Sequence, residues 1–96
     1  KPTLKERKFW GRLARTVGCI ACRIDGVRNT HVSIHHIDGR TKRGSHKRVL
    51  PLCGPHHQTG DIDTPCLHPW VARFEKKYGT QYELLKMCHE ILAQHE

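Results

Sequence analysis

The chain has 96 residues, of which 36% are hydrophobic and 6% aromatic, which suits a single domain with a small core. Cores of this size often need a disulfide or a metal ion to hold them. The formal net charge is +8 and is uneven: residues 1–48 hold 13 Lys/Arg and 3 Asp/Glu, and residues 49–96 hold 4 and 6. Concentrated positive charge favours a polyanionic partner such as nucleic acid. No apolar stretch of membrane-spanning length and no signal peptide is present, so we expect no membrane partner.

The N-terminal segment, residues 4–17, has the apolar spacing of an amphipathic helix and is followed by Gly18, a typical helix terminator. Its predicted buried stripe consists of Leu4, Phe9, Trp10, Leu13 and Val17. The basic residues that lie off this stripe are Lys5, Lys8, Arg12 and Arg15.

The middle of the chain alternates short regular segments with turns. We predict, in order, a tight turn at 19–26, a strand at 30–37, a polar loop at 38–46, a second strand at 49–52 and a short helix at 55–60. Pro51 places the second strand at a sheet edge.

Two further helices follow an irregular segment at 61–69. The first spans 70–78 and ends at Gly79, with a predicted buried face of Trp70, Val71, Phe74 and Tyr78. A capping box, Thr80 to Glu83, opens the second, whose predicted buried residues are Leu84, Leu85, Cys88, Ile91 and Leu92. We expect one domain over residues 1–96, with a core at 19–60 and a C-terminal helical extension at 69–95.

Two chelating pairs, Cys19-x2-Cys22 and Cys53-x2-His56, are separated by the predicted strand, loop and strand. Zinc prefers four tetrahedral nitrogen and sulfur ligands, and two-residue spacers let each pair reach one ion from a turn. We therefore predict a structural zinc ion on these four residues, with Cys66 as an alternative to His56. The odd number of cysteines, five, fits disulfides poorly, so we expect reduced cysteines and an intracellular protein.

A second group of histidines has the residue types that phosphodiester hydrolysis requires. This reaction needs a base, a metal ion and basic groups that hold the nucleic-acid backbone. We assign His36 as general base, and His35 and His57 as ligands of a catalytic metal. The third ligand stays open among His68, Asp61 and Asp63. No role is assigned to the remaining histidines, His31, His46, His89 and His95.

The predicted loop and its border are rich in basic residues, which would contact DNA phosphates without reading sequence. These residues are Arg40, Lys42, Arg43, Lys47 and Arg48.

Cys-x2-Cys, then His-His-Ile at a strand end, then Leu-Pro-Leu-Cys-x2-His-His resembles the HNH, or ββα-metal, nucleases over about residues 19–60. The resemblance implies a base at His36 and metal ligands at His35 and His57. It implies a treble-clef-like α+β core, here with an N-terminal basic helix and two C-terminal packing helices. The Asn that orients the base in that family should fall near Lys47 or Arg48 and is absent.

The tail, with a loop histidine and then Phe-Glu-Lys-Lys-Tyr-Gly at 74–79, is similar to a phage subgroup, the recombination enhancement function nucleases. That similarity favours His68 as third ligand. It implies dependence on the RecA recombinase filament, the cytoplasm of a bacterial host, and a disordered basic region ahead of residue 1. Mg²⁺ or Mn²⁺ is the expected working ion, with Zn²⁺ possible in the isolated protein.

Two functions fit these patterns. The favoured one is a metal-dependent DNA endonuclease acting on RecA-bound DNA. The other is a non-catalytic zinc module that binds nucleic acid or a recombination protein. Both predict the zinc site, and they differ in what they require of His36.

Overall fold

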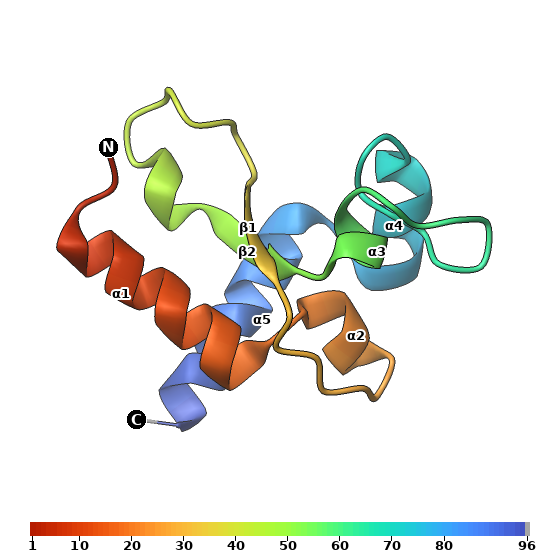
Figure 1. Cartoon of the computed structure of the whole chain (residues 1–96), viewed down its shortest axis with the longest axis horizontal. Coiled ribbons are helices and arrows are strands. Elements are labelled where there is room, and N and C mark those ends of the chain that lie inside the picture. The colour runs from red at the N-terminus through yellow and green to blue at the C-terminus, as the bar shows by residue number, and fades with distance from the viewer. Residues whose placement is uncertain (96) are drawn as a thin grey trace.

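The computed structural model describes residues 1–95 (Figure 1). Helix α1 (Leu4–Arg12) continues into a π-helical turn, η1 (Leu13–Val17), and together they confirm the predicted helix at 4–17. A capping box starts α1: Thr3 Oγ1 accepts from the Glu6 amide at 3.1 Å. The buried stripe begins later than predicted, because Leu4 is 63% exposed and the first fully buried side chain is Leu13.

The predicted turn at 19–26 is wrong, because its first part is a short helix, α2 (Ile20–Ile24). Cys19 caps this helix: its Sγ accepts from the Cys22 amide at 3.4 Å. Gly18 allows the sharp change of direction before it. Its φ is +68°, and a Cβ there would lie 2.6 Å from the carbonyl oxygen of Asn29.

Strands β1 (Ser33–His36) and β2 (Val49–Leu52) form a two-stranded antiparallel sheet. The predicted second strand is confirmed, whereas β1 is shorter than the predicted 30–37. Pro51 faces Ile34 in the register, and both strands of so small a sheet are edges. The connecting loop ends in a 3-10 turn, η2 (Ser45–Lys47).

Helix α3 (Gly54–His57) is followed by an irregular segment and then by α4 (Val71–Tyr78) and α5 (Gln81–Gln94). The Gly79 terminus and the Thr80 capping box are confirmed. The predicted burial of Trp70 and Val71 is wrong, because their side chains are 50% and 39% exposed. They lie at the start of α4, where only the later residues Phe74 and Tyr78 reach the core.

The core lies where α5 passes the sheet and η1 (Figure 1). Its largest fully buried side chains include Leu13, Ile20, Leu50, Leu52, Leu67, Phe74 and Leu84. On α5, Cys88 is fully buried as predicted, and Leu85 is only partly buried. The molecule is thus a small α+β fold. Among residues 1–95, no helix is both long and apolar enough to cross a membrane.

Candidate metal centres

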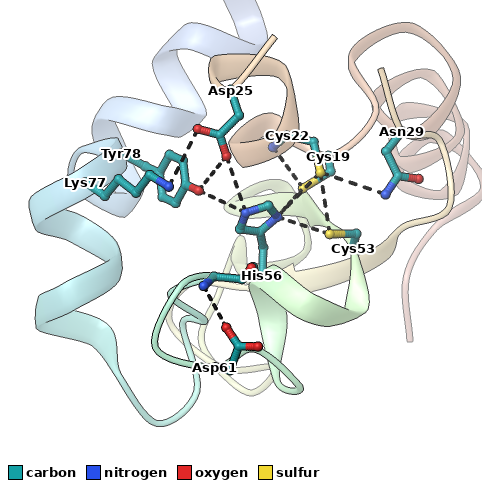
Figure 2. A network of polar contacts seen from close by, with 10 residues as sticks. Cys19, Cys22, Asp25, Asn29, Cys53, His56, Asp61, Lys77 and Tyr78 are labelled. Carbon is teal, nitrogen blue, oxygen red and sulfur yellow. Dashed lines mark hydrogen bonds and ion pairs between the residues drawn. The ribbon is translucent and has the colours of Figure 1, made fainter. Parts of the chain in front are cut away.

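Side chains from two short helices and their N-caps meet in the first centre: Cys19 and Cys22 at α2, and Cys53 and His56 at α3 (Figure 2). Nδ1 of His56 lies 3.6, 3.5 and 3.1 Å from the Sγ atoms of Cys19, Cys22 and Cys53. The Sγ atoms of Cys22 and Cys53 are 3.7 Å apart. The predicted quartet is therefore brought together.

These distances are close to the edges of a zinc tetrahedron, about 3.8 Å between sulfurs and about 3.5 Å between sulfur and nitrogen. All four residues are buried. Burial raises the pKa of the Cys19 thiol to about 12 and also raises that of Cys22. Buried thiolates need a cation beside them, so the cluster fits a structural metal such as zinc.

The second nitrogen of the His56 ring, Nε2, is also hydrogen-bonded. It donates to the hydroxyl oxygen of Tyr78 at 2.9 Å, and that hydroxyl donates to Oδ2 of Asp25 at 2.7 Å (Figure 2). Lys77 lies 3.8 Å from the other oxygen of Asp25. A proton on Nε2 leaves the Nδ1 lone pair directed at the three sulfurs, the usual arrangement around a metal-binding histidine.

Cys66, the alternative fourth ligand, is not in this cluster. It is buried, and its Sγ donates to the carbonyl oxygen of His68 at 3.0 Å.

The second cluster consists of His35 at the end of β1, His57 at the end of α3, and His68. One ring nitrogen of each lies within 4.8 Å of the others. His68 is brought there by backbone pairing, since its amide donates to the carbonyl of His57 at 2.9 Å. The same pairing joins the Leu67 amide to the carbonyl of His56 at 2.8 Å.

Asp61 and Asp63, the other candidates for third ligand, lie outside this group. Oδ1 of Asp61 instead accepts the amides of Asp63 and Thr64 at 2.9 and 3.0 Å, which closes a turn. The helix predicted at 55–60 ends at His57 in the structure, so Asp61 and Asp63 lie in the irregular segment beyond it.

Two polar side chains fix the rings of this cluster. Nε2 of His35 lies 2.8 Å from Oε1 of Gln81, and Nδ1 of His57 lies 3.2 Å from the Ser33 hydroxyl. An amide oxygen only accepts, so Gln81 favours a proton on Nε2 of His35 and a lone pair on Nδ1. Burial lowers the pKa of His35. The pKa of His57 is lowered to about 4, mainly by burial and further by the charge of the neighbouring His35 and His68. Both rings are therefore neutral near pH 7, the form that binds metals.

His35 and His36 both line one open cavity of about 530 Å³, together with His57, His68 and Arg40. Nε2 of His36 lies 2.9 Å from Nδ1 of His46. Nδ1 of His36 is buried and has no hydrogen-bond partner among the described residues. Burial and then Arg40 lower the pKa of His36, so the ring is neutral near pH 7.

His46 is the residue that the sequence reasoning missed, because an isolated histidine in a polar loop carries no pattern. It is partly buried rather than on the surface. The signal that could have pointed to it was the absence, near Lys47 or Arg48, of the Asn that the resemblance to HNH nucleases implies.

The basic loop is only partly free. Nε of Arg48 is 2.7 Å from Oδ2 of Asp38, which also accepts from the Tyr82 hydroxyl. Nη1 of Arg48 donates to the carbonyl oxygen of Arg43 at 3.1 Å. The side chains in the predicted set that remain exposed are those of Arg40, Lys42, Arg43 and Lys47.

The fold and the two clusters define a small α+β domain with a buried Cys/His site and an open histidine site. The sequence model of the family described as "Recombination enhancement, RecA-dependent nuclease" matches residues 2–93, and the chain belongs to that family. It is also 31% identical over 87 residues to the uncharacterized protein YdfU of Escherichia coli K12. That alignment covers 85% of this chain and 23% of YdfU, so the chain spans less than a quarter of that relative.

Proposed function

We propose that this domain is a metal-dependent DNA endonuclease of the HNH, or ββα-metal, type. The observation that carries the proposal is one cavity that holds both a three-histidine cluster and a neutral fourth histidine, His36. A closed, four-ligand cluster beside it suits structure, whereas three ligands around an open cavity suit catalysis.

His35, His57 and His68 have the donor atoms to hold a divalent cation. Such an ion, Mg²⁺ or Mn²⁺ in the working enzyme, would supply stabilisation of the charge that develops on the phosphate and the leaving oxygen. Imidazole ligands also accept zinc, so the isolated protein is expected to carry Zn²⁺ in some preparations.

His36 acts as the general base in this mechanism. A neutral imidazole takes the proton of the attacking water, and the pKa of His36 is lowered, which keeps it neutral. Nε2 is engaged by His46, so Nδ1, which has no hydrogen-bond partner among the described residues, is the atom left for that proton. Arg40, in the cavity wall, holds a phosphate oxygen.

Exposed Lys42, Arg43 and Lys47 extend the phosphate contacts away from the cavity. Arg48 contributes through its ion pair with Asp38, which fixes the shape of the loop. The family description supports RecA-bound DNA as the substrate of the whole protein.

The test is His36→Ala, assayed on naked single strands, naked duplex and RecA-coated filaments. We expect cleavage to fall by at least about 10²-fold, the usual cost of losing a general base, with zinc content and DNA affinity retained. The matched control is His31→Ala, because His31 is an exposed histidine outside both clusters. Undiminished cleavage by His36→Ala would refute the assignment of His36 as general base. No cleavage of any substrate by the wild type would favour the non-catalytic zinc module instead.

A further inference from the structure

The hydrogen bond between His36 and His46 has no counterpart in the pattern that led to His36. We propose that His46 is the positioning residue of the general base. The inference rests on the proposed function. It depends on four observations: the contact itself, the way His46 is anchored, the proton that the pair shares, and the position of each ring relative to the cavity.

The contact is short and direct. Nε2 of His36 and Nδ1 of His46 are 2.9 Å apart, and the two rings meet edge to face with centroids 5.1 Å apart. At this distance the two nitrogens share one proton, one as donor and the other as acceptor.

His46 is anchored independently of its own side chain. It lies in η2, which Gly44 opens with φ +76°, and its carbonyl oxygen accepts the indole N–H of Trp10 at 2.7 Å. The indole ring also packs edge-on against both imidazoles, at 5.4 Å from His36 and 5.7 Å from His46. Helix α1 thereby fixes the turn that carries His46, the residue in contact with the base.

The shared proton decides which atom of His36 can act. A donor at Nε2, accepted by Nδ1 of His46, leaves the lone pair of His36 on Nδ1. The opposite arrangement would put the N–H on Nδ1, a buried atom that makes no hydrogen bond to the described residues, and an unpaired N–H costs more than an unpaired lone pair. His46 therefore selects the tautomer that a base requires.

The two rings differ in access to the site. His36 lines the cavity shared with the three-histidine cluster, whereas His46 is not among the residues that line it. His46 acts through His36 and does not itself touch substrate, which makes it a positioning residue.

The experiment compares His46→Ala, His46→Asn and the control His31→Ala, with metal-loaded protein and RecA-coated DNA. Alanine removes the acceptor, whereas the amide oxygen of Asn restores one. We expect kcat to fall by about 10–100-fold in His46→Ala with KM unchanged, as for other partners that orient a functional imidazole, and to recover largely in His46→Asn. Zinc content and Tm should match those of the wild type, because Trp10 binds the backbone of His46.

A second readout is independent of cleavage. Long-range 1H–15N spectra report the tautomer of His36, which we expect to be Nε2–H in wild type and His46→Asn, and mixed in His46→Ala. An unchanged kcat and tautomer in His46→Ala would overturn the role of His46 and leave the role of His36 intact. Equal losses in the Ala and Asn variants with a lowered Tm would also overturn it, since that pattern indicates packing alone. An active His36→Ala variant would instead overturn the base assignment on which this inference rests, and a wild type that cleaves no substrate would overturn the proposed function.

Discussion

Two histidine-containing clusters lie side by side in this domain and share helix α3, which contributes His56 to one and His57 to the other. The first is closed: all four of its residues are buried, and three are cysteines. The second is open, with buried His35, partly buried His57 and exposed His68 around a cavity.

The difference shows how two neighbouring residues, His56 and His57, come to lie in different clusters. Consecutive residues of a helix point about 100° apart, so one ring of α3 turns to the sulfurs and the next turns to the cavity. The surroundings then decide the chemistry. In the proposed function, four buried ligands would leave no place for substrate, whereas three ligands at a cavity would leave room for water and phosphate.

The largest expected effect, on stability, comes from a substitution that breaks the closed cluster. Cys22→Ser removes one thiolate from the tetrahedron and leaves the remaining buried thiols without a tightly held cation. Because structural zinc in small domains contributes about 10–16 kcal/mol of apparent binding free energy, we expect loss of the folded state at 37 °C. Circular dichroism with zinc analysis measures this. A folded, metal-free Cys22→Ser protein would show that the core alone suffices.

The next largest effect comes from a substitution that tests the open cluster separately from the closed one. His57→Ala removes a ligand from the open cluster and leaves His56 in place, so we expect one tightly held ion per chain instead of two. Fold and Tm should change little, and cleavage should fall. Elemental analysis after dialysis against excess divalent metal measures the stoichiometry. A stoichiometry of one in both wild type and His57→Ala would refute the second site.

A smaller effect is expected from removing a hydrogen-bond partner of a metal-binding histidine. Tyr78→Phe removes the hydroxyl that joins Nε2 of His56 to Asp25 and keeps the ring in the core. Outer-shell partners of metal-binding histidines are worth about 10–100-fold in affinity, so zinc should dissociate measurably more readily. Competition with a chromogenic chelator measures this, with Tyr82→Phe as control. Equal zinc affinity in both variants would assign Tyr78 to packing.

The smallest effect is a pH dependence. The pKa of His57 is held at about 4 in the folded protein, against an ordinary value of 6.5. Between these values the unfolded chain binds a proton that the folded chain does not, so stability is lost as pH falls from about 7 towards 4. With the open cluster free of metal, urea midpoints should fall less steeply with pH in His57→Ala than in the wild type. Parallel pH profiles would contradict a depressed pKa at His57.

Short-range spacing determined much of this protein. Cys-x2-Cys and Cys-x2-His were enough to name the quartet, because each pair lies within a single turn of chain. The capping box at Thr80 and the helix after it were likewise confirmed, since they depend on neighbouring residues alone. The same holds for strand β2, which was predicted with its observed bounds.

Only the tertiary structure decided the partners of those residues. His68 rather than Asp61 joins His35 and His57, because backbone pairing folds residues 67 and 68 against α3. Gln81 reaches His35 from 46 positions away, and Trp10 holds His46 from 36 positions away. Hydrogen bonds across such separations depend on how the helices pack, which no local pattern of residues encodes. The contact between His36 and His46 could be found only once α1, η2 and β1 had been brought together.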